Sequence, residues 1–325
     1  MQPLYLNRLK EEIGSHEWKW QPDTVYWGGG TPSLLDPADL KMIHDQIPGR
    51  PWLEATLETS PGTVTPEKAE GWRRAGIDRV SLGVQSFIEP EIRRTGRKHT
   101  AEVVAAEVRM LKQAGIRKIN VDLIAGLAEQ TPESWKISLN RLLDLEVDHA
   151  SIYMLEVDEE SRLGKEITLG GTRYGAMDVP SEARITEFYE TAVELLKSAG
   201  LNRYEISNFA LPGHESIHNL KYWQRKPYRG FGVDAHSFDG IERIANTDSL
   251  PEYLEKTDPV VDRSMAKPDE ERYFLGLRLT EGIPAQDAPV TRAEEEGLLE
   301  RSEGRLRLTP RGVLLSNEVF EEFIA

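Results

Sequence analysis

One short phrase occurs three times along the chain and constrains its fold more than any other feature. The copies are Ala75-Gly76-Ile77-Asp78-Arg79, Ala114-Gly115-Ile116-Arg117-Lys118 and Ala199-Gly200-Leu201-Asn202-Arg203. Each copy closes an amphipathic stretch and precedes a β-rich run, as happens when a helix ends on a left-handed glycine and an apolar residue folds back on its last turn. The sequence therefore predicts a helix-to-strand connection that repeats.

Strand-like and helical segments alternate through the first half of the chain. We expect strands at Thr24–Trp27, Leu53–Thr59, Val80–Val84, Ile119–Leu123 and Ser151–Leu155. The helices expected between them span Pro37–Ile47, Pro66–Ala75, Ala101–Ala114 and Pro132–Leu143, with Asp36, Thr65, Thr100 and Thr131 as N-caps. This alternation predicts parallel strands with right-handed crossovers, in a barrel or partial barrel whose ligands bind at the C-terminal strand ends.

The pattern changes after the fifth strand. The segment Val157–Pro180 is rich in glycine and charge, and we interpret it as a long functional or well-supported loop. A helix is expected at Glu182–Ala199. From about Ser264 the pattern indicates helices and a short hairpin, so we expect a large domain over residues 1–263 and a small C-terminal α+β domain over residues 264–325.

Composition excludes several classes of protein. The net charge of −15 opposes binding to phosphate backbones, so nucleic acid is not an expected partner. No apolar run approaches the ~18 residues of a membrane-spanning helix, and the N-terminal residues lack a signal-peptide core. We therefore expect a cytoplasmic protein. The 325 residues include no cysteine, which rules out disulfides, thiolate nucleophiles and cysteine-ligated metals within them.

Polar and glycine residues follow several of the predicted strands. Gly28, Gly29 and Gly30 end the first strand and leave bare backbone within reach of a ligand, although a tight turn alone would also explain them. Glu58 ends the second strand and suits the two hydroxyls of a ribose, unless it is a solvated loop residue. Gln85 and Asp122 lie near the ends of later strands, and Arg97 follows in a position to face a carboxylate. Their convergence predicts a ligand site.

Two histidines lie among aromatic residues further along the chain. His218 is followed by Tyr222 and Trp223, and His236 comes after Phe231 and several glycines. This composition suits a flat aromatic ligand with an axial metal ligand, such as haem. Spacing alone favours the alternative, in which both histidines are satisfied polar residues inside a packed strand region.

Five ordered blocks and a tail resemble the HemN/HemW family of radical S-adenosylmethionine proteins. The blocks are Gly28-Gly29-Gly30-Thr31-Pro32-Ser33-Leu34, Glu58 with Pro61-Gly62-Thr63, Gly83-Val84-Gln85-Ser86-Phe87, Asn120-Val121-Asp122-Leu123 with Gly126-Leu127, and Tyr204-Glu205-Ile206-Ser207-Asn208-Phe209. The tail is Leu308-Thr309-Pro310-Arg311-Gly312 with Ser316-Asn317-Glu318-Val319-Phe320. The resemblance runs nearly end to end. It implies a partial (β/α)6 radical-SAM-type barrel whose first strand is missing, so that the visible strands are the second to the sixth.

The resemblance also implies ligands. A pocket for S-adenosylmethionine would be formed by Gly30, Thr31, Glu58, Gln85, Arg97 and Asp122. The segment His218-Asn219-Leu220-Lys221-Tyr222-Trp223 resembles the H-N-x-x-Y-W block that is associated with haem binding in HemW-type proteins. The tentative haem residues are His218, Tyr222 and Trp223. Haem or porphyrin, a haem-acceptor protein and a second copy of the chain are the partners that this resemblance implies.

One departure from the family is severe. The family's 4Fe-4S cluster is held by a C-x-x-x-C-x-x-C motif, which would precede Met1, and no cysteine here replaces it. Three hypotheses follow. The chain is a HemW-like haem chaperone shortened at its N-terminus, an oxygen-independent coproporphyrinogen III oxidase-like oxidoreductase similarly shortened, or a cluster-free binding or scaffold protein. The H-N-x-x-Y-W block favours the first hypothesis. Without the cluster, this chain is not expected to cleave S-adenosylmethionine reductively.

Overall fold

A computed structural model describes residues 1–156, 162–169, 171, 173–286 and 288–324. The chain forms two compact units, each made of separate segments. The barrel unit contains residues Tyr26–Asp36 and Ala55–Glu215, and the terminal unit contains Met1–Val25, Pro37–Glu54 and Ser216–Ala325. The domain boundary predicted at residue 264 falls inside the terminal unit and stays a prediction.

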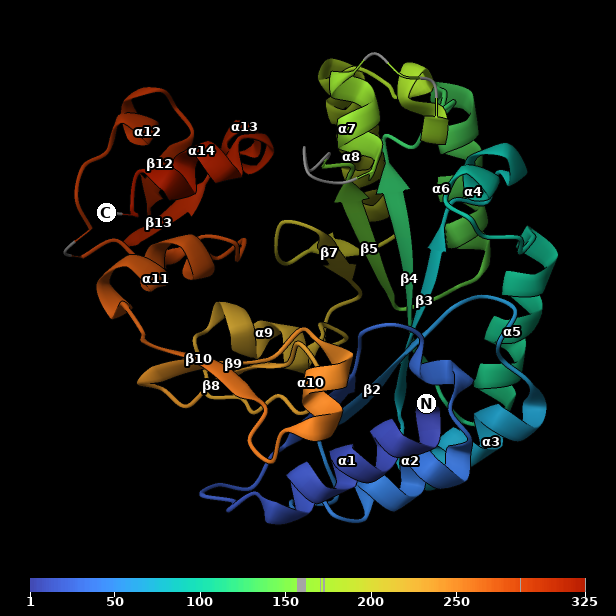
Figure 1. Cartoon of the computed structure of the whole chain (residues 1–325). Coiled ribbons are helices and arrows are strands. Elements are labelled where there is room, and N and C mark those ends of the chain that lie inside the picture. The colour runs from blue at the N-terminus through green and yellow to red at the C-terminus, as the bar shows by residue number, and fades with distance from the viewer. Residues whose placement is uncertain (157–161, 170, 172, 287, 325) are drawn as a thin grey trace. The chain divides into compact units, whose positions relative to one another are not determined.

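A seven-stranded sheet forms the centre of the barrel unit (Figure 1). Its strands follow the order β1-β2-β3-β4-β5-β7-β6. Their bounds are β1 Thr24–Trp27, β2 Glu54–Thr59, β3 Arg79–Gln85, β4 Lys118–Ala125, β5 His149–Met154, β6 Asn202–Arg203 and β7 Asn208–Ala210. The five predicted strands are therefore confirmed as neighbours, with ends that differ by a few residues.

Strands β2 to β5 run parallel, as predicted. Leu57 pairs with Val80, Leu82 with Val121, and Leu123 with Ile152. Only β7 runs opposite to the others, because it pairs antiparallel with β5 on one side and with β6 on the other. The predicted mixed α/β class with a parallel barrel-like sheet is thus confirmed. The antiparallel strand β7 was not predicted from the alternating pattern of strands and helices.

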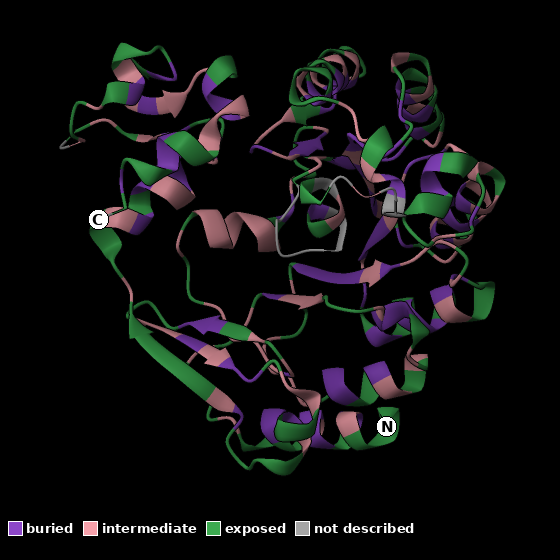
Figure 2. Cartoon of the chain, turned by 45° about the horizontal axis from the view of Figure 1, so that its top comes forward, coloured by how far each residue is buried: buried purple, intermediate pink, exposed green. Residues whose placement is uncertain are grey.

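Helices cover the outer face of this sheet (Figure 1). They are α3 Pro66–Ala75, α4 Glu89–Arg94, α5 Ala101–Gln113, α6 Pro132–Asp144 and α8 Glu182–Ser198. The side chains of Thr65, Thr100 and Thr131 accept hydrogen bonds from backbone N–H groups in the first turns, so three predicted N-caps are confirmed. Figure 2 shows that most residues of the long strands are buried. Trp72 of α3 and Trp135 of α6 are the largest fully buried side chains among the described residues.

The repeated phrase ends three helices in the same way. Gly76, Gly115 and Gly200 have φ values of 100°, 87° and 87°. The N–H group of the apolar residue after each glycine bonds back to a carbonyl five residues earlier, from Ile77 to Trp72 for example. This is the Schellman motif, which satisfies carbonyls that the helix end leaves open. The connection predicted from the sequence is confirmed at all three positions.

Short helices occupy the described part of the predicted long loop. Helix α7 spans Arg162–Thr168, and the 3-10 helix η2 spans Arg173–Asp178. Residues 157–161, 170 and 172 of the Val157–Pro180 prediction lie outside the described residues. None of the helices in the described ranges combines the length and hydropathy that a membrane crossing requires.

The terminal unit is built from segments near both ends of the chain. Its elements up to residue 265 are α1 Gln2–Ser15, α2 Pro37–His44, α9 Ile217–Trp223, α10 Leu250–Glu255, and a sheet of β8 His236–Phe238, β9 Glu242–Asn246 and β10 Val260–Met265. Its last part contains α11 Pro268–Gly276, β11 Ile283–Pro284, α12 Arg292–Glu295, α13 Pro310–Leu314, α14 Ser316–Glu321 and the hairpin of β12 Leu299–Ser302 and β13 Arg305–Leu308. The helices and hairpin predicted there are confirmed.

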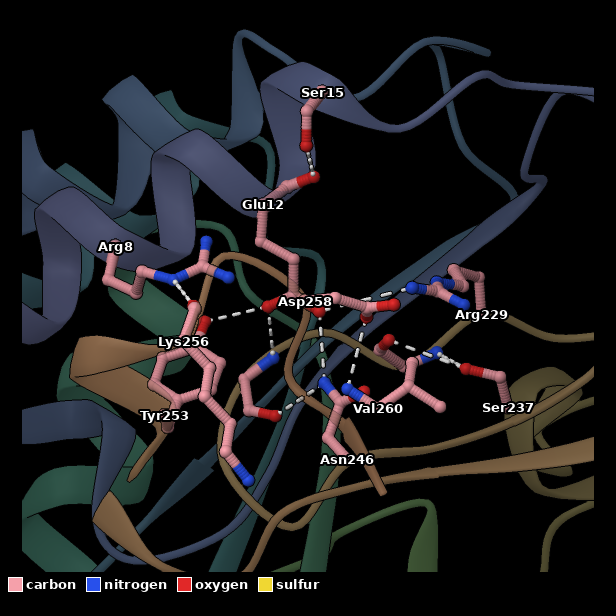
Figure 3. A network of polar contacts seen from close by, with 12 residues as sticks. Arg8, Glu12, Ser15, Arg229, Ser237, Asn246, Tyr253, Lys256, Asp258 and Val260 are labelled. Carbon is pink, nitrogen blue, oxygen red and sulfur yellow. Dashed lines mark hydrogen bonds and ion pairs between the residues drawn. The ribbon is translucent and has the colours of Figure 1, made fainter. Parts of the chain in front are cut away.

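A buried carboxylate ties the first helix to the second half of the chain (Figure 3). Glu12 of α1 is 5% exposed and accepts hydrogen bonds from the Gly232 N–H at 2.9 Å, the Asn246 amide at 2.9 Å and the Tyr253 hydroxyl at 2.6 Å. The neighbouring Arg8 donates to the carbonyls of Lys256 and Thr257. Because a buried charge is tolerated only when it is well hydrogen-bonded, this network fixes the position of α1.

Candidate functional sites

The first candidate site lies at the C-terminal strand ends of the barrel unit and begins with Glu58. This carboxylate accepts a hydrogen bond of 2.7 Å from the Tyr26 hydroxyl and one of 3.2 Å from the Gly29 N–H. Burial, together with the Glu58 charge, raises the pKa of Tyr26, so its phenol remains a hydrogen-bond donor. Strand β1 and strand β2 thus hold the Glu58 side chain beside the glycine loop.

The glycine loop is shaped as the sequence predicted. Gly29 and Gly30 have φ values of 76° and 62°, which favour glycine, and the space where a Cβ would stand is open for 4 Å around both. A Cβ on Gly28 would instead lie 2.9 Å from the Tyr26 ring and 3.3 Å from Glu58. The loop therefore presents bare backbone on one side and packs against the acidic residue on the other. Thr31 follows directly and precedes the 3-10 turn Pro32–Leu34.

The second acidic residue, Asp122, lies on β4. It accepts hydrogen bonds from Ser81 at 3.1 Å and from the Asn120 amide at 2.7 Å. Desolvation raises the pKa of Asp122, the nearby Glu58 charge raises it further, and the hydrogen bonds oppose both effects. The charge of Glu58 thus acts on Asp122, and a ligand site shared by the two carboxylates stays a prediction.

Two further predicted residues complete this site. Gln85, at the end of β3, has a φ of 70°, a left-handed conformation that costs energy for a residue with a side chain and that is common at functional sites. Arg97 donates to the Gly83 carbonyl at 2.6 Å and to the Ser60 hydroxyl at 3.4 Å. Burial lowers the pKa of Arg97, and the charge of Asp122 opposes that effect. The structure therefore gathers Glu58, Gln85, Arg97 and Asp122 around the strand ends.

Three residues of this site had no predicted role. Tyr26, Ser81 and Asn120 hold the two acids in place, and each lies on a strand that the sequence did predict. A polar residue inside a buried strand needs a partner, and that signal was available for Ser81 and Asn120. The hydrogen bond between Tyr26 and Glu58 joins residues 32 positions apart. It could be predicted only from the order of the strands in the sheet.

The second candidate site lies in the terminal unit, on helix α9. Ser216 caps the helix with its side chain. The buried carboxylate of Glu54 accepts hydrogen bonds from the Ser216 hydroxyl at 3.1 Å and from the N–H groups of Ile217 and His218 at 3.1 and 3.0 Å. Lys221 forms an ion pair with Asp23. A carboxylate at a helix N-terminus is favoured by both hydrogen bonding and the helix dipole, so the backbone of α9 is held firmly.

Both ring nitrogens of His218 have partners. Nδ1 lies 2.9 Å from the Thr24 hydroxyl, and Nε2 lies 2.9 Å from the Tyr222 hydroxyl, one turn further along α9. The Tyr222 ring is edge-on to the His218 ring, with 5.2 Å between centroids. Burial lowers the pKa of His218 to about 4, so the imidazole is neutral near pH 7. His218 and Tyr222 thus contact each other, and a haem site formed by them stays a prediction.

The other predicted residues of this region have different surroundings. The Trp223 ring lies 4.5 Å from the guanidinium of Arg278. Phe231 packs edge-on against His16, with 5.3 Å between ring centroids. The exposed His236 contacts the Asp234 carbonyl at 3.1 Å through Nδ1. Thr24 and Glu54, which orient His218 and its helix, had no predicted functional role.

Comparisons with known proteins agree with this architecture. Residues 1–142 match the model of the radical SAM superfamily, and residues 270–315 match that of the HemN C-terminal domain. The heme chaperone HemW of Bacillus subtilis strain 168 is 33% identical, over 98% of this chain and 91% of that protein. The heme chaperone HemW of Escherichia coli strain K12 is 29% identical, over 98% and 88% of the two chains.

A solved structure shares the fold. Coproporphyrinogen III oxidase (HemN) from Escherichia coli, described as a radical SAM enzyme, superposes with a TM-score of 0.82 over 99% of this chain and 82% of that chain. The identity is 21%, so this likeness concerns the fold alone.

Proposed function

The chain belongs to the HemW family within the radical SAM superfamily, and from that premise we propose that it is a cytoplasmic haem-binding protein that delivers haem to an acceptor protein. The observation that carries this proposal is the near full-length similarity to heme chaperones, at 33% identity. The segment from His218 to Trp223, which lies within α9, supports the haem chaperone over the oxidase hypothesis.

His218 is the candidate axial ligand of the haem iron. Imidazole is a common haem ligand, and it ligates in its neutral form. The low pKa of His218, about 4, favours that form, and the hydroxyl of Thr24 supplies the outer partner that orients many metal-binding histidines. Tyr222 and Trp223 add aromatic surface on the same helix, which supports contact with a porphyrin.

The residues at the strand ends fit S-adenosylmethionine. We assign Gly30 and Thr31 to its methionine end and Glu58 to its ribose, and Gln85, Arg97 and Asp122 to the walls of the pocket. The open backbone at Gly29 and Gly30 supports this assignment, as does the carboxylate of Glu58 at the end of a strand. The bound molecule would supply a sulfonium group, and the chain's own residues bind it and orient it.

The residues present do not fit a 4Fe-4S cluster. Such clusters are held by cysteine thiolates, and the 325 residues contain none. Within the described ranges, no group of three histidine, aspartate or glutamate side chains is arranged to hold a metal ion.

A haem titration tests the proposal. Hemin is added to the full chain and the Soret band is followed in wild type, H218A and H236A, with circular dichroism to establish equal folding. We expect H218A to lose most of the affinity and H236A to keep it. Equal affinity in wild type and H218A would remove His218 from the site and make His236 the next candidate. Size-exclusion chromatography with and without hemin tests whether a homodimer forms.

A further inference from the structure

The hydrogen bonds of His218 define which of its nitrogens is available to a metal. A neutral imidazole has one N–H group and one lone pair. Tyr222 offers a phenol, which is a stronger hydrogen-bond donor and a weaker acceptor than the aliphatic hydroxyl of Thr24. The favoured arrangement therefore has the Tyr222 hydroxyl donating to Nε2 and the Nδ1 N–H donating to the Thr24 oxygen, each over 2.9 Å.

This arrangement makes Nε2 the metal-binding atom and also covers it. The lone pair that would bind iron is the one that accepts the Tyr222 hydrogen bond, so the two interactions exclude each other. We propose that Tyr222 masks the His218 ligand atom, and that haem iron binds only when the Tyr222 side chain moves away. This inference rests on the proposed haem-binding function and adds a residue that controls access to the ligand.

The surroundings allow the side chain to move while the ligand stays in place. Glu54 holds the backbone N–H of His218, and Thr24 holds its Nδ1 atom, so the imidazole is anchored at two points. Tyr222 is anchored by the Nε2 contact and by ring packing against His218 and Tyr228, with 4.8 Å between the Tyr222 and Tyr228 centroids. His218 and Tyr222 are both half-buried, so the Tyr222 side chain is not fully enclosed.

The magnitude of the effect follows from one hydrogen bond. Because a net hydrogen bond changes an equilibrium by about two- to tenfold, Y222F should bind hemin about two- to tenfold more tightly than wild type. T24V removes the partner of Nδ1, and loss of such an outer partner weakens metal binding by roughly tenfold or more. The two variants therefore change affinity in opposite directions.

Hemin titrations of the full chain test whether the Tyr222 hydroxyl masks the Nε2 atom of His218. The set is wild type, Y222F, T24V and H218A, with Y228F as a matched control that removes the same hydroxyl from the neighbouring ring. Each protein is also titrated with metal-free protoporphyrin IX, which has no iron to compete for Nε2. We expect Y222F to bind hemin more tightly and protoporphyrin unchanged, with Y228F like wild type in both titrations.

The outcomes separate this inference from the proposed function. If H218A loses hemin binding while Y222F binds hemin no more tightly than wild type, His218 remains the ligand and the mask is overturned. If Y222F tightens protoporphyrin binding equally, the gain comes from ring contacts and the mask is also overturned. If H218A binds hemin as wild type does, the ligand assignment fails, and the mask fails with it. Circular dichroism establishes that all variants are folded.

Discussion

The hydroxyl of Tyr26 lies 2.7 Å from the carboxylate of Glu58 and joins the ends of two neighbouring strands. The bond is charge-assisted, since the raised pKa of Tyr26 keeps its proton on the phenol. Glu58 also accepts the Gly29 N–H, so its orientation is fixed before any ligand arrives. Such preorganisation lowers the free-energy cost of ordering the site when a ligand binds.

The first prediction concerns this bond. Y26F should weaken binding of S-adenosylmethionine by about three- to tenfold, because Glu58 loses the partner that orients it. E58Q should weaken binding further, and Y204F, which removes a hydroxyl that contacts His149 instead, should have no effect. Calorimetric titration measures all three. Unchanged affinity in Y26F, with a clear loss in E58Q, would show that Tyr26 does not orient the acid.

A second prediction concerns the iron–sulfur cluster. Anaerobic reconstitution of this chain with iron and sulfide, followed by removal of unbound ions, should leave no stoichiometric cluster, because no thiolate is present to hold it. Iron and sulfide analysis measures the result, and a HemW protein with its cysteine motif serves as the positive control. Four irons and four sulfides retained per chain would contradict the expectation.

The third prediction concerns the Glu12 network shown in Figure 3. E12A removes the acceptor of three buried donors, so the free energy of unfolding should fall by about 3–5 kcal/mol. Glu11 is adjacent and exposed, and E11A should change that free energy by less than about 0.5 kcal/mol. Urea denaturation followed by circular dichroism compares the two. A similar, small effect of both substitutions would mean that Glu12 contributes little to stability.

The fourth prediction concerns pH and His218. Its pKa is about 4 in the folded chain and 6.5 in the unfolded chain, so between these values the unfolded chain binds a proton that the folded chain does not. Stability should therefore fall as pH drops from 6.5 towards 4, and by pH 4.5 His218 should contribute a loss of about 2.5 kcal/mol.

Urea denaturation at pH 7 and pH 4.5 measures that loss in wild type and H218Q. The variant lacks the titrating ring, so its unfolding free energy should fall by about 2.5 kcal/mol less over the same interval. An equal fall in the two proteins would show that His218 is protonated as easily in the folded chain as in the unfolded chain.

Local sequence signals predicted much of the barrel unit. Thr65 and Gly76 mark the start and end of α3 because a cap and a left-handed glycine act within one turn. Glu58 and Asp122 could be predicted as neighbours because parallel strands end at the same edge of a sheet. The antiparallel strand β7 was not predicted as a strand, since its three residues carry too short a pattern to separate from a loop.

Contacts between segments far apart in the sequence could not be predicted from local sequence patterns. The partner of His218 on its Nδ1 side, Thr24, is 194 residues away, and the carboxylate of Glu54 that holds the same helix is 164 residues from His218. Each is an ordinary polar residue in its local context. Such pairs are decided by how whole segments pack, and no periodicity within one segment contains that information.

The terminal unit has a consequence for the order in which the chain is built. Helix α1 is synthesised long before its partners, because the last partner of Glu12 to be synthesised, Tyr253, lies 241 residues further on. At typical rates of translation that interval is on the order of ten to fifty seconds. Throughout it, the apolar face of α1, with Leu6, Leu9 and Ile13, has no completed core to enter. The nascent chain therefore presents a hydrophobic helix for a long period, and a ribosome-associated folding factor could bind it there.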